Sequence, residues 1–412
     1  MALENLPDDI QRRILSRIPC IADRGRMSLV CHAWRGLIRK QRNQFVPLLP
    51  RPRPLPWLLL PALFPDGSAR AACVLSGCGV HHGLNITPLG ARCFGSHDGG
   101  WLFLDDGREP RVHKAVHIRS GNVCDLPGEL RRRNDPYPHR YRMVIHAAAL
   151  SSSPEDANYV GAAIVTSWRL PAPGPGALAA VPPRRRCVAL WVKDSGVAMD
   201  FVPHGDEITA LHVEDVLYLH HGGAFLFLTK GEHISVCTPI RLQHALTAQW
   251  QAIGFRPRGR LYGQYVVARY LVVSREELLM VVRFSPHPSQ PTSKFMVFQV
   301  TKREMPDADA DANFPVAWYP YTWSELHSLD GRMLFVGHGC SRSYEASQYP
   351  GFKDGIYFLD DGEFYDTAMI FGNSNVRRYP CSDNGKWSEG RVQRCFPRSD
   401  PSNRSAPVWL LP

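Results

Sequence analysis

The short glycine-rich run Gly337–Ser343 contains several residue types that are common in catalytic sites. It places a thiol, Cys340, two positions after an imidazole, His338, and such a pair can act as nucleophile and base. Positions this close in a strand or turn rarely meet in the geometry of attack, so a packed turn is the favoured interpretation. The run also lacks the lysine of a phosphate-binding loop, and its serines do not sit in a nucleophile elbow. It therefore predicts no catalytic residue.

Two other groups of residues have types that bind metals. The best zinc candidates are Cys73, Cys78, His81, His82 and Cys93. They lack the paired short spacings of zinc sites, so core thiols and a surface histidine pair are favoured. The acidic run 307–313 alternates like a calcium loop, but Ala312 replaces the turn glycine and Trp318 replaces the bidentate glutamate. The sequence thus predicts no metal, no cofactor and no enzymatic activity.

The length of the chain limits the number of domains that it can form, and its charge indicates the kind of partner that it can bind. A chain of 412 residues is too long for one ordinary core, so two domains or one large repeat array are expected. Residues 1–70 hold 12 basic and 5 acidic residues and carry most of the net charge of +10. That distribution suits an acidic partner. The short runs Arg131–Arg133 and Arg184–Arg186 lack interleaved aromatic residues, so no nucleic-acid partner is expected.

The composition indicates an intracellular protein, in the nucleus or the cytoplasm. No run approaches the roughly 20 apolar residues of a membrane span, and the acidic start Met1–Asn5 does not resemble a signal peptide. No membrane partner is expected. The 11 cysteines are odd in number and scattered, which is typical of reduced thiols rather than disulfides.

The first 42 residues have the pattern of three short helices. A proline suited to a first helical turn precedes apolar residues at helical spacing: Pro7, Ile10, Ile14, Leu15 and Ile18. Pro19 ends this helix, Asp23 is a candidate N-cap for the second, and Trp34 begins the third. Helices this short bury little surface alone. Their apolar residues exceed what an internal core needs, so a partner is expected.

This unit resembles the F-box family in Leu6-Pro7, in 14–19, in 28–31 and in Trp34-Arg35. The resemblance implies docking on the Skp-type adaptor of a cullin-RING ubiquitin ligase. The adaptor-binding residues that it implies are Leu6, Pro7, Ile10, Ile14, Leu15, Ile18, Pro19, Val30, Cys31 and Trp34. Gly25-Arg26 departs from the family, which more often has leucine or another good helix former there, so fraying of the second helix is expected. The alternative is a helical cap on the following domain.

The rest of the chain has a different pattern of residues, with a proline-rich segment followed by short apolar runs. Five prolines in Pro47–Pro56 favour a semi-rigid spacer, and the alternative is a strap packed through Trp57–Leu60. From about residue 71, short apolar runs between Gly, Asp and Pro turns predict many strands, and the echo of Gly100–Gly107 in Gly355–Gly362 favours a propeller. The predicted fold class is α+β multidomain, a small three-helix F-box followed by a large all-β propeller of about six to eight blades. The predicted domains are 1–45, a linker or strap at 46–70, and the propeller at 71–412.

The second part also resembles the C-terminal domain of a large plant family of F-box proteins, a domain of unknown function interpreted as a β-propeller. The resemblance rests mainly on Ser328–Gly331, Val336–Ser343 and Tyr349–Phe358. It implies a non-catalytic substrate-recognition subunit of a Skp-cullin-F-box ubiquitin ligase, which holds the adaptor, and through it a cullin, by the F-box and an unknown protein substrate by the propeller. The alternative is an adaptor-binding propeller scaffold with no ligase target.

Two further stretches carry finer expectations. Closed propellers commonly combine strands from both ends of the domain in one blade, and Val408–Leu411 is apolar enough for a closing strand or a buried plug. The aromatic residues Tyr319, Tyr321 and Trp323 could line a peptide groove, but propeller cores use such residues freely, so core positions are favoured.

Overall fold

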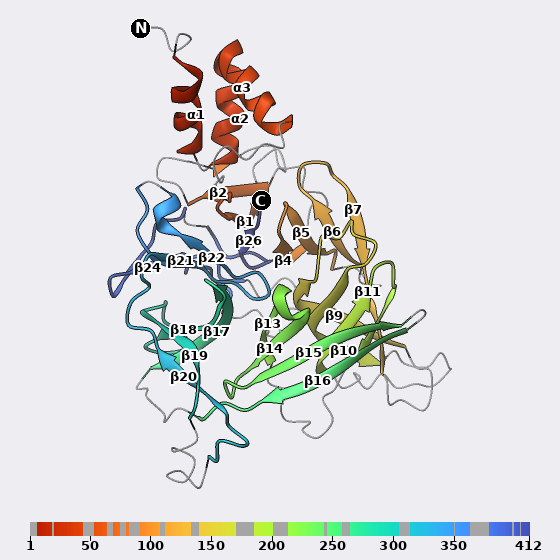
Figure 1. The fold of residues 1–412 in the computed structure, drawn as a ribbon. Helices are drawn as coiled ribbons and strands as arrows, with labels where there is room; N and C mark the ends of the chain where they lie inside the picture. Colours follow the sequence, from red (N-terminus) through yellow and green to blue (C-terminus); the bar gives the residue numbers. More distant parts are fainter. Residues whose placement is uncertain are drawn as a thin grey trace.

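The computed structural model begins with the predicted three helices and continues into strands (Figure 1). The residues that it describes are 6–18, 20–43, 53–63, 69–74, 80–81, 91–107, 112–132, 140–169, 185–200, 213–242, 245–257, 264–304, 314–349, 351–362, 379–397, 399–403 and 405–412. The expected architecture of short helices followed by a β region is confirmed.

The helices are α1 (Asp8–Ser16), α2 (Ile21–Val30) and α3 (His32–Asn43). Their shared core consists of Leu15, Trp34 and Leu37. Two expectations about their ends were wrong. The N-cap of α2 is Cys20 rather than Asp23, and α3 begins at His32 rather than at Trp34. Cys20 is buried against the first sheet, so a tertiary contact sets the start of α2. The helix also passes through Gly25 without a break.

The described strands form six hydrogen-bonded groups. Blade 1 joins β26 (Val408–Leu410), β1 (Trp57–Leu63), β2 (Ala69–Cys73) and β3 (Val80–His81). Blade 2 contains β4 (Arg92–His97), β5 (Trp101–Asp105), β6 (His113–His117) and β7 (Val123–Leu126). The third group contains β8 (Glu129–Arg132), β9 (Arg140–Leu150), β10 (Val160–Arg169), β11 (Arg185–Val192) and β12 (Val197–Asp200).

Three more blades complete the ring. Blade 3 contains β13 (Val213–Leu219), β14 (Ala224–Thr229), β15 (Ile234–Leu242) and β16 (Ala245–Ile253). Blade 4 contains β17 (Tyr265–Ser274), β18 (Glu277–Ser285), β19 (Lys294–Lys302) and β20 (Tyr321–Glu325). Blade 5 has the order β22 (Arg342–Glu345), β21 (Arg332–Phe335), β23 (Gly355–Phe358), β24 (Gly385–Ser388) and β25 (Arg391–Gln393).

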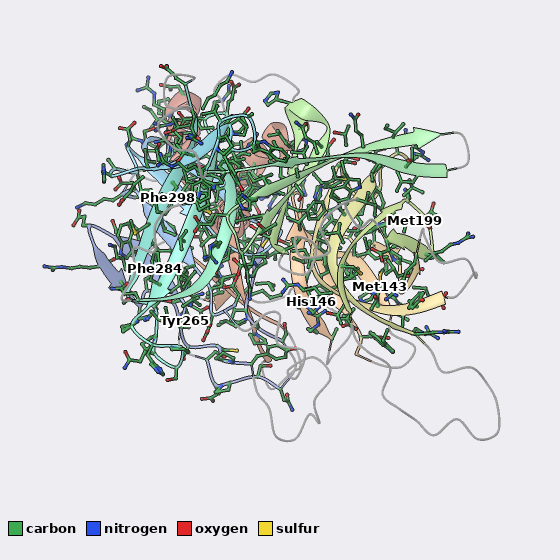
Figure 2. The ribbon with its side chains drawn as sticks, turned by 90° about the horizontal axis from the view of Figure 1, so that it is seen from below. Met143, His146, Met199, Tyr265, Phe284 and Phe298 are labelled. Carbon is green, nitrogen blue, oxygen red and sulfur yellow. The ribbon has the colours of Figure 1, made fainter. Side chains whose placement is uncertain are left out.

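The blade count differs from the expectation of six to eight. Among the described strands, five groups are open blades, and the group β8–β12 closes on itself as a barrel. The closure is a parallel pair between β12 and β8, with Val197 opposite Glu129 and Asp200 opposite Arg132. A parallel pair between strands far apart in the chain leaves no turn signal between them, so strand spacing could not reveal it. Figure 2 shows Met143, His146 and Met199 on the barrel side and Tyr265, Phe284 and Phe298 on the side of blade 4.

Blade 1 joins the two ends of the ring. The strand β26 pairs with β1 in antiparallel register, Trp57 opposite Leu410 and Leu59 opposite Val408. The expectation of a closing strand at Val408–Leu411 is confirmed. Part of the segment expected as linker or strap therefore lies inside the ring, and it is buried there at Trp57–Leu60. The preceding prolines at 47–50 lie outside the described residues.

Candidate functional site

The most exposed large apolar side chains of the described helical unit lie at the corner between α2 and α3. Leu29 is 74 % exposed and Val30 is 67 % exposed. The helix α2 ends at Val30, the backbone at Cys31 is extended, and α3 begins at His32. The unit's own core does not use these two side chains. An exposed apolar corner of this kind is suited to contact with a partner.

The predicted adaptor-binding residues fall into three groups. Leu15 and Trp34 are almost fully buried, at 1 % and 3 % exposed. The exposed ones are Pro7 and Val30, and the partly buried ones are Leu6, Ile10, Ile14, Ile18 and Cys31. Pro19 lies outside the described residues. Leu15 and Trp34 can therefore act on a partner only by holding the helices in place, and the adaptor role of the whole set stays a prediction.

The charge of the helical unit lies on its surface. Its exposed arginines include Arg13, Arg17, Arg26 and Arg39. Arg26 forms an ion pair with Asp23 at 2.9 Å, one turn earlier on α2. The exposed surface of the three helices is thus rich in arginine, which agrees with the acidic partner that the charge distribution indicates.

The run from Gly337 to Ser341 is buried against strands of three different groups, and we call it the central plug. Its Gly339 N–H donates to Asp215 Oδ1 on β13 at 2.8 Å. A Cβ at Gly339 would lie 2.7 Å from the carbonyl oxygen of Ala148 on β9. The ring of His338 lies 4.9 Å from that of Tyr270 on β17. The plug therefore touches three different strand groups at their inner strands.

Burial decides the chemistry of the plug. Burial raises the pKa of Cys340 to about 12 and lowers the pKa of His338 to about 3. Both groups are therefore neutral near pH 7, whereas a nucleophilic pair needs a thiolate. The packed-turn interpretation of Gly337–Ser343 is confirmed, because His338 and Cys340 are buried with it.

A buried polar network surrounds the plug, and sequence reasoning did not find it. Asp215 accepts hydrogen bonds from the backbone N–H groups of Val216, Leu271 and Gly339, at 2.7 to 2.8 Å. Burial nevertheless raises the pKa of Asp215 to about 7. One carboxyl group thus connects blade 3, blade 4 and the plug. Its signal in the sequence is weak, since a single aspartate in Val213–Leu219 resembles a strand-end residue.

The second half of this network connects blades 4 and 5. Asp361 Oδ1 accepts the Tyr270 hydroxyl at 2.6 Å and an Arg283 N–H at 3.1 Å. Arg283 also donates to Asp383 Oδ2 at 2.6 Å, and it is only 1 % exposed. Burial raises the pKa of Asp361 to about 6, against the influence of Arg283. These charges satisfy one another inside the protein and hold neighbouring blades in register.

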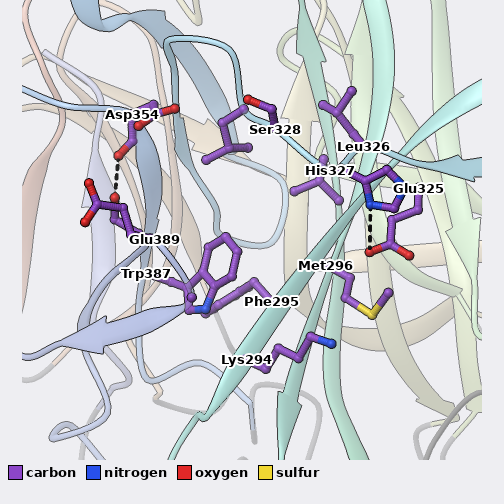
Figure 3. A pocket seen from close by; sticks show the side chains of 14 residues that line it. Lys294, Phe295, Met296, Glu325, Leu326, His327, Ser328, Asp354, Trp387 and Glu389 are labelled. Carbon is purple, nitrogen blue, oxygen red and sulfur yellow. Dashed lines mark hydrogen bonds and ion pairs between the residues drawn. The ribbon is translucent and has the colours of Figure 1, made fainter.

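A pocket of about 410 Å³ lies between blades 4 and 5 (Figure 3). Its lining residues are Lys294, Phe295, Met296, Val297, Glu325, Leu326, His327, Ser328, Leu329, Asp354, Trp387, Ser388, Glu389 and Gly390. The pocket exists because β20 ends at Glu325, so that the chain leaves the first half of β19 uncovered. The facing wall comes from the hairpin of β24 and β25, which turns at Glu389 and Gly390 with positive φ.

Other residues singled out in the sequence have structural positions. Of the three aromatic residues favoured as core positions, Trp323 is buried and stacks on Phe255 at 4.6 Å, whereas Tyr319 and Tyr321 are only partly buried. Among the metal candidates, Cys73 is buried, whereas Cys78, His82 and the run 307–313 lie outside the described residues. Within the described ranges, no group of three or more metal-ligating side chains gathers. Those ranges also contain no helix of the length and apolarity that a bilayer crossing requires.

Comparison with known families assigns both parts of the chain. Residues 3–45 match the F-box domain, and residues 80–380 match the KIB1-4 beta-propeller. The second match covers well over half of the sequence. The chain belongs to the KIB1-4 beta-propeller family. The expected combination of an F-box with a propeller is therefore confirmed, and the helical unit is henceforth called the F-box.

Solved structures add little to this assignment. One is the complex of the fission yeast SREBP-SCAP binding domains, with 8 % identity, coverage of 74 % of this chain and 94 % of that chain, and a TM-score of 0.23. Another is a 6-phosphogluconolactonase-like protein from Bacteroides uniformis, with 10 % identity, coverage of 66 % and 95 %, and a TM-score of 0.20. Likenesses this weak carry no argument about the propeller. No curated protein matches the chain.

Proposed function

We propose that this protein is the substrate-recognition subunit of a Skp-cullin-F-box ubiquitin ligase. The observation that supports this role is an F-box joined to a closed propeller, with Cys20 of the F-box buried among residues of blade 1 such as Trp57 and Leu59. A fixed junction keeps a bound target at a set distance from the adaptor. The protein itself would do no chemistry. It would accelerate ubiquitin transfer by holding a target lysine near the charged carrier at high effective concentration.

The F-box would hold the adaptor through the predicted surface together with Leu29. The exposed corner of Leu29 and Val30 supplies apolar contact, and the exposed arginines of the F-box favour an acidic adaptor. The propeller would hold the target protein. We assign residues 1–45 to adaptor binding, 46–70 to the junction and 71–412, together with β1, to target binding. This role implies a location in the nucleus or the cytoplasm.

The adaptor surface can be tested in a pull-down with a purified Skp-type adaptor. Leu29→Asp and Val30→Asp should each weaken binding by roughly 30-fold or more, because a charge at a desolvated contact costs about 2 kcal/mol or more. Val123→Asp is a matched control, since Val123 is an exposed apolar residue of blade 2. Adaptor binding that is equal in all three variants and in the original protein would refute the proposed surface.

A second experiment separates the receptor from the scaffold alternative. The adaptor complex is purified from cells with and without a proteasome inhibitor, and the bound proteins are offered ubiquitin in a reconstituted ligase. A receptor should yield at least one bound protein that gains ubiquitin and that accumulates with the inhibitor. A complex whose bound proteins never gain ubiquitin would favour the scaffold.

A further inference from the structure

We propose that the pocket between blades 4 and 5 binds a basic side chain, arginine above all, in an extended segment of the target protein. This inference rests on the proposed function, since it names the chemistry by which the propeller would recognise its target. Two of the sequence stretches singled out above meet here, because Ser328 and Leu329 line one side and Asp354 lines the other. The sequence alone gave these stretches no shared role.

The wall formed by Asp354 and Trp387 is held in place by close backbone packing. A Cβ at Gly355 would lie 2.4 Å from Lys386 Cε and 2.9 Å from the carbonyl oxygen of Trp387. Only glycine therefore allows β23 to approach β24 this closely. The hydroxyl of Ser388 donates to the carbonyl oxygen of Asp354 at 2.9 Å. These contacts hold the backbone of Asp354 and Gly355 against β24, so the wall is preformed before any ligand arrives.

The floor of the pocket is aromatic and the rim carries carboxylates. Phe295 is almost fully buried, and its ring lies 6.3 Å from that of Trp387. Figure 3 shows Asp354 and Glu389 on the same side as Trp387, with Glu325 across the pocket. A guanidinium group is planar, stacks on indole faces and donates two parallel hydrogen bonds to a carboxylate. This combination of residues matches that geometry.

The two carboxylates beside Trp387 are available to a ligand. Within the described part of the chain, the carboxylate of Asp354 makes no hydrogen bond or ion pair. Glu389 pairs with Lys353 at 3.3 Å, and both side chains are largely exposed. An ion pair in water contributes about 0–1 kcal/mol, so a ligand cation can replace Lys353 at little cost.

Three side chains that can carry positive charge lie in or near the pocket, and two of them, Lys386 and His327, have partners. Lys294 lies at the lower edge of the pocket, below Met296 and on the side of Glu325 (Figure 3). Lys386 is near enough to Asp354 for an electrostatic interaction between their charges. However, its Nζ donates a hydrogen bond to the carbonyl oxygen of Lys353 at 3.1 Å and lies over the ring of Tyr357. His327 pairs with Glu325 at 3.7 Å. The wall of Asp354, Glu389 and Trp387 thus faces the pocket as a cation acceptor.

The size of the pocket suits one long side chain with part of its backbone. Its volume of about 410 Å³ lies within the roughly 300–1,000 Å³ of ligand pockets. The titratable lining residues include three carboxylates, Glu325, Asp354 and Glu389, and one lysine, Lys294. The excess of carboxylates beside aromatic side chains therefore favours a cationic side chain over a neutral or acidic one.

The test uses the full chain in complex with its adaptor and two synthetic peptides. One is the extended peptide Ac-Ala-Leu-Arg-Leu-Ala-amide, and the other carries citrulline, the neutral isostere of arginine, at the central position. Titration calorimetry should show binding of the arginine peptide and at least about fivefold weaker binding of the citrulline peptide. Equal affinity for the two peptides, or no binding of the arginine peptide, would overturn the inference.

Variants locate the binding. Asp354→Asn and Glu389→Gln should each weaken the arginine peptide about threefold to tenfold, and Trp387→Leu at least as much. Asp125→Asn removes an exposed carboxylate from blade 2 and is the matched control. The two carboxylate variants keep the pocket's shape, so they decide the matter if Trp387→Leu fails to fold. An Asp125→Asn effect as large as that of Asp354→Asn would show nonspecific attraction and overturn the site. A complex that forms but ignores the peptide refutes only this inference, whereas loss of adaptor binding refutes the proposed function.

Discussion

The F-box and the propeller solve the problem of burying apolar surface in opposite ways. The F-box has a core of three buried residues, Leu15, Trp34 and Leu37, and leaves Leu29 and Val30 in solvent. The propeller joins its two ends through β26, and the core of this closure contains Trp409, which is completely buried. A unit too small to bury its own side chains is suited to a partner, whereas a closed ring is stable enough to carry pockets on its surface.

Glycines show the same contrast on a smaller scale. In the F-box, a Cβ added at Gly25 or Gly36 would meet nothing within 4 Å. In the propeller, a Cβ at Gly339 or Gly355 would strike backbone atoms of a neighbouring strand. The ring uses glycine where close packing demands it. The helices contain glycine where packing does not require it, and they lose stability as a result.

The largest effect is expected from opening the ring. Deleting residues 407–412 removes β26 and with it Trp409, whose indole N–H donates to the carbonyl oxygen of Val336 at 2.8 Å. Loss of a single buried tryptophan side chain costs about 3–5 kcal/mol, and here a closing strand is lost too. The propeller should fail to fold or melt far below the full-length protein, as measured by calorimetry. An unchanged melting temperature would show that closure contributes little.

Trp34→Ala should act on the F-box alone. The loss of about 3–5 kcal/mol from a core of three residues exceeds what so small a unit can tolerate. Helical circular dichroism and adaptor binding should both fall, whereas the main melting transition, which belongs to the ring, should keep its temperature. A lower melting temperature of the ring in this variant would show that the F-box and the ring unfold as one cooperative unit. That result would contradict the independence of the two parts.

Gly339→Ala tests the central plug. The residue has a φ of 73°, which disfavours a side chain, and the new Cβ would stand 2.7 Å from the carbonyl oxygen of Ala148. Backbone strain and overpacking together should cost about 2–4 kcal/mol. Urea denaturation followed by tryptophan fluorescence measures this loss. A variant as stable as the original protein would mean that the plug is loosely held.

The buried carboxyl groups predict a pH dependence that belongs to the ring. Burial raises the pKa of Asp215 from 3.8 to about 7 and that of Asp361 to about 6. Groups that bind more protons in the folded state than in the unfolded state stabilise the fold at low pH, and this stability is lost as the pH rises through the folded pKa. Burial lowers the pKa of His338 to about 3, which has the opposite effect below about pH 6.5.

His97, whose pKa burial lowers to about 4, acts in the same direction as His338, so two histidines oppose the two carboxyl groups between pH 5 and pH 6.5. Asp215→Asn removes one contribution that falls with pH, so the melting temperature of this variant should rise by a few degrees relative to that of the original protein between pH 5 and pH 7. The variant is less stable overall because the amide nitrogen cannot accept a backbone N–H, so the difference between the two pH slopes is the quantity to compare. Equal slopes in the two proteins would contradict the assignment.

The smallest expected effect is an increase in the stability of the F-box. Gly25→Ala fills an open position inside α2 and should stabilise the F-box by about 0.5–1 kcal/mol. Thermal melting of the helical signal, followed at 222 nm, should move upward. Replacement of glycine by alanine is thus expected to stabilise the F-box at Gly25 and to destabilise the propeller at Gly339. A destabilised Gly25→Ala variant would contradict this difference between the two regions.

The sequence by itself determined the elements whose signals are local. The helical spacing of Ile10, Ile14 and Leu15 predicted α1, and the apolar end of the chain predicted the closing strand β26. The likeness of the two parts to an F-box and a propeller domain was also readable, because family motifs are contiguous stretches such as Ser328–Gly331. Each of these features depends on neighbours in the chain and therefore appears in the order of the residues.

Only the tertiary structure decided the features that join distant residues. The barrel closes by a parallel pair between β8 and β12, which no turn announces. The start of α2 at Cys20 depends on a contact with blade 1, and the burial of Trp34 leaves Leu29 as the more exposed contact. Asp215 and Gly339 form a hydrogen bond although they are 124 positions apart in the chain. No sequence pattern indicates a contact between residues so far apart. Burial, which sets their hydrogen bonds and their pKa values, is a property of the packed ring and not of any segment within it.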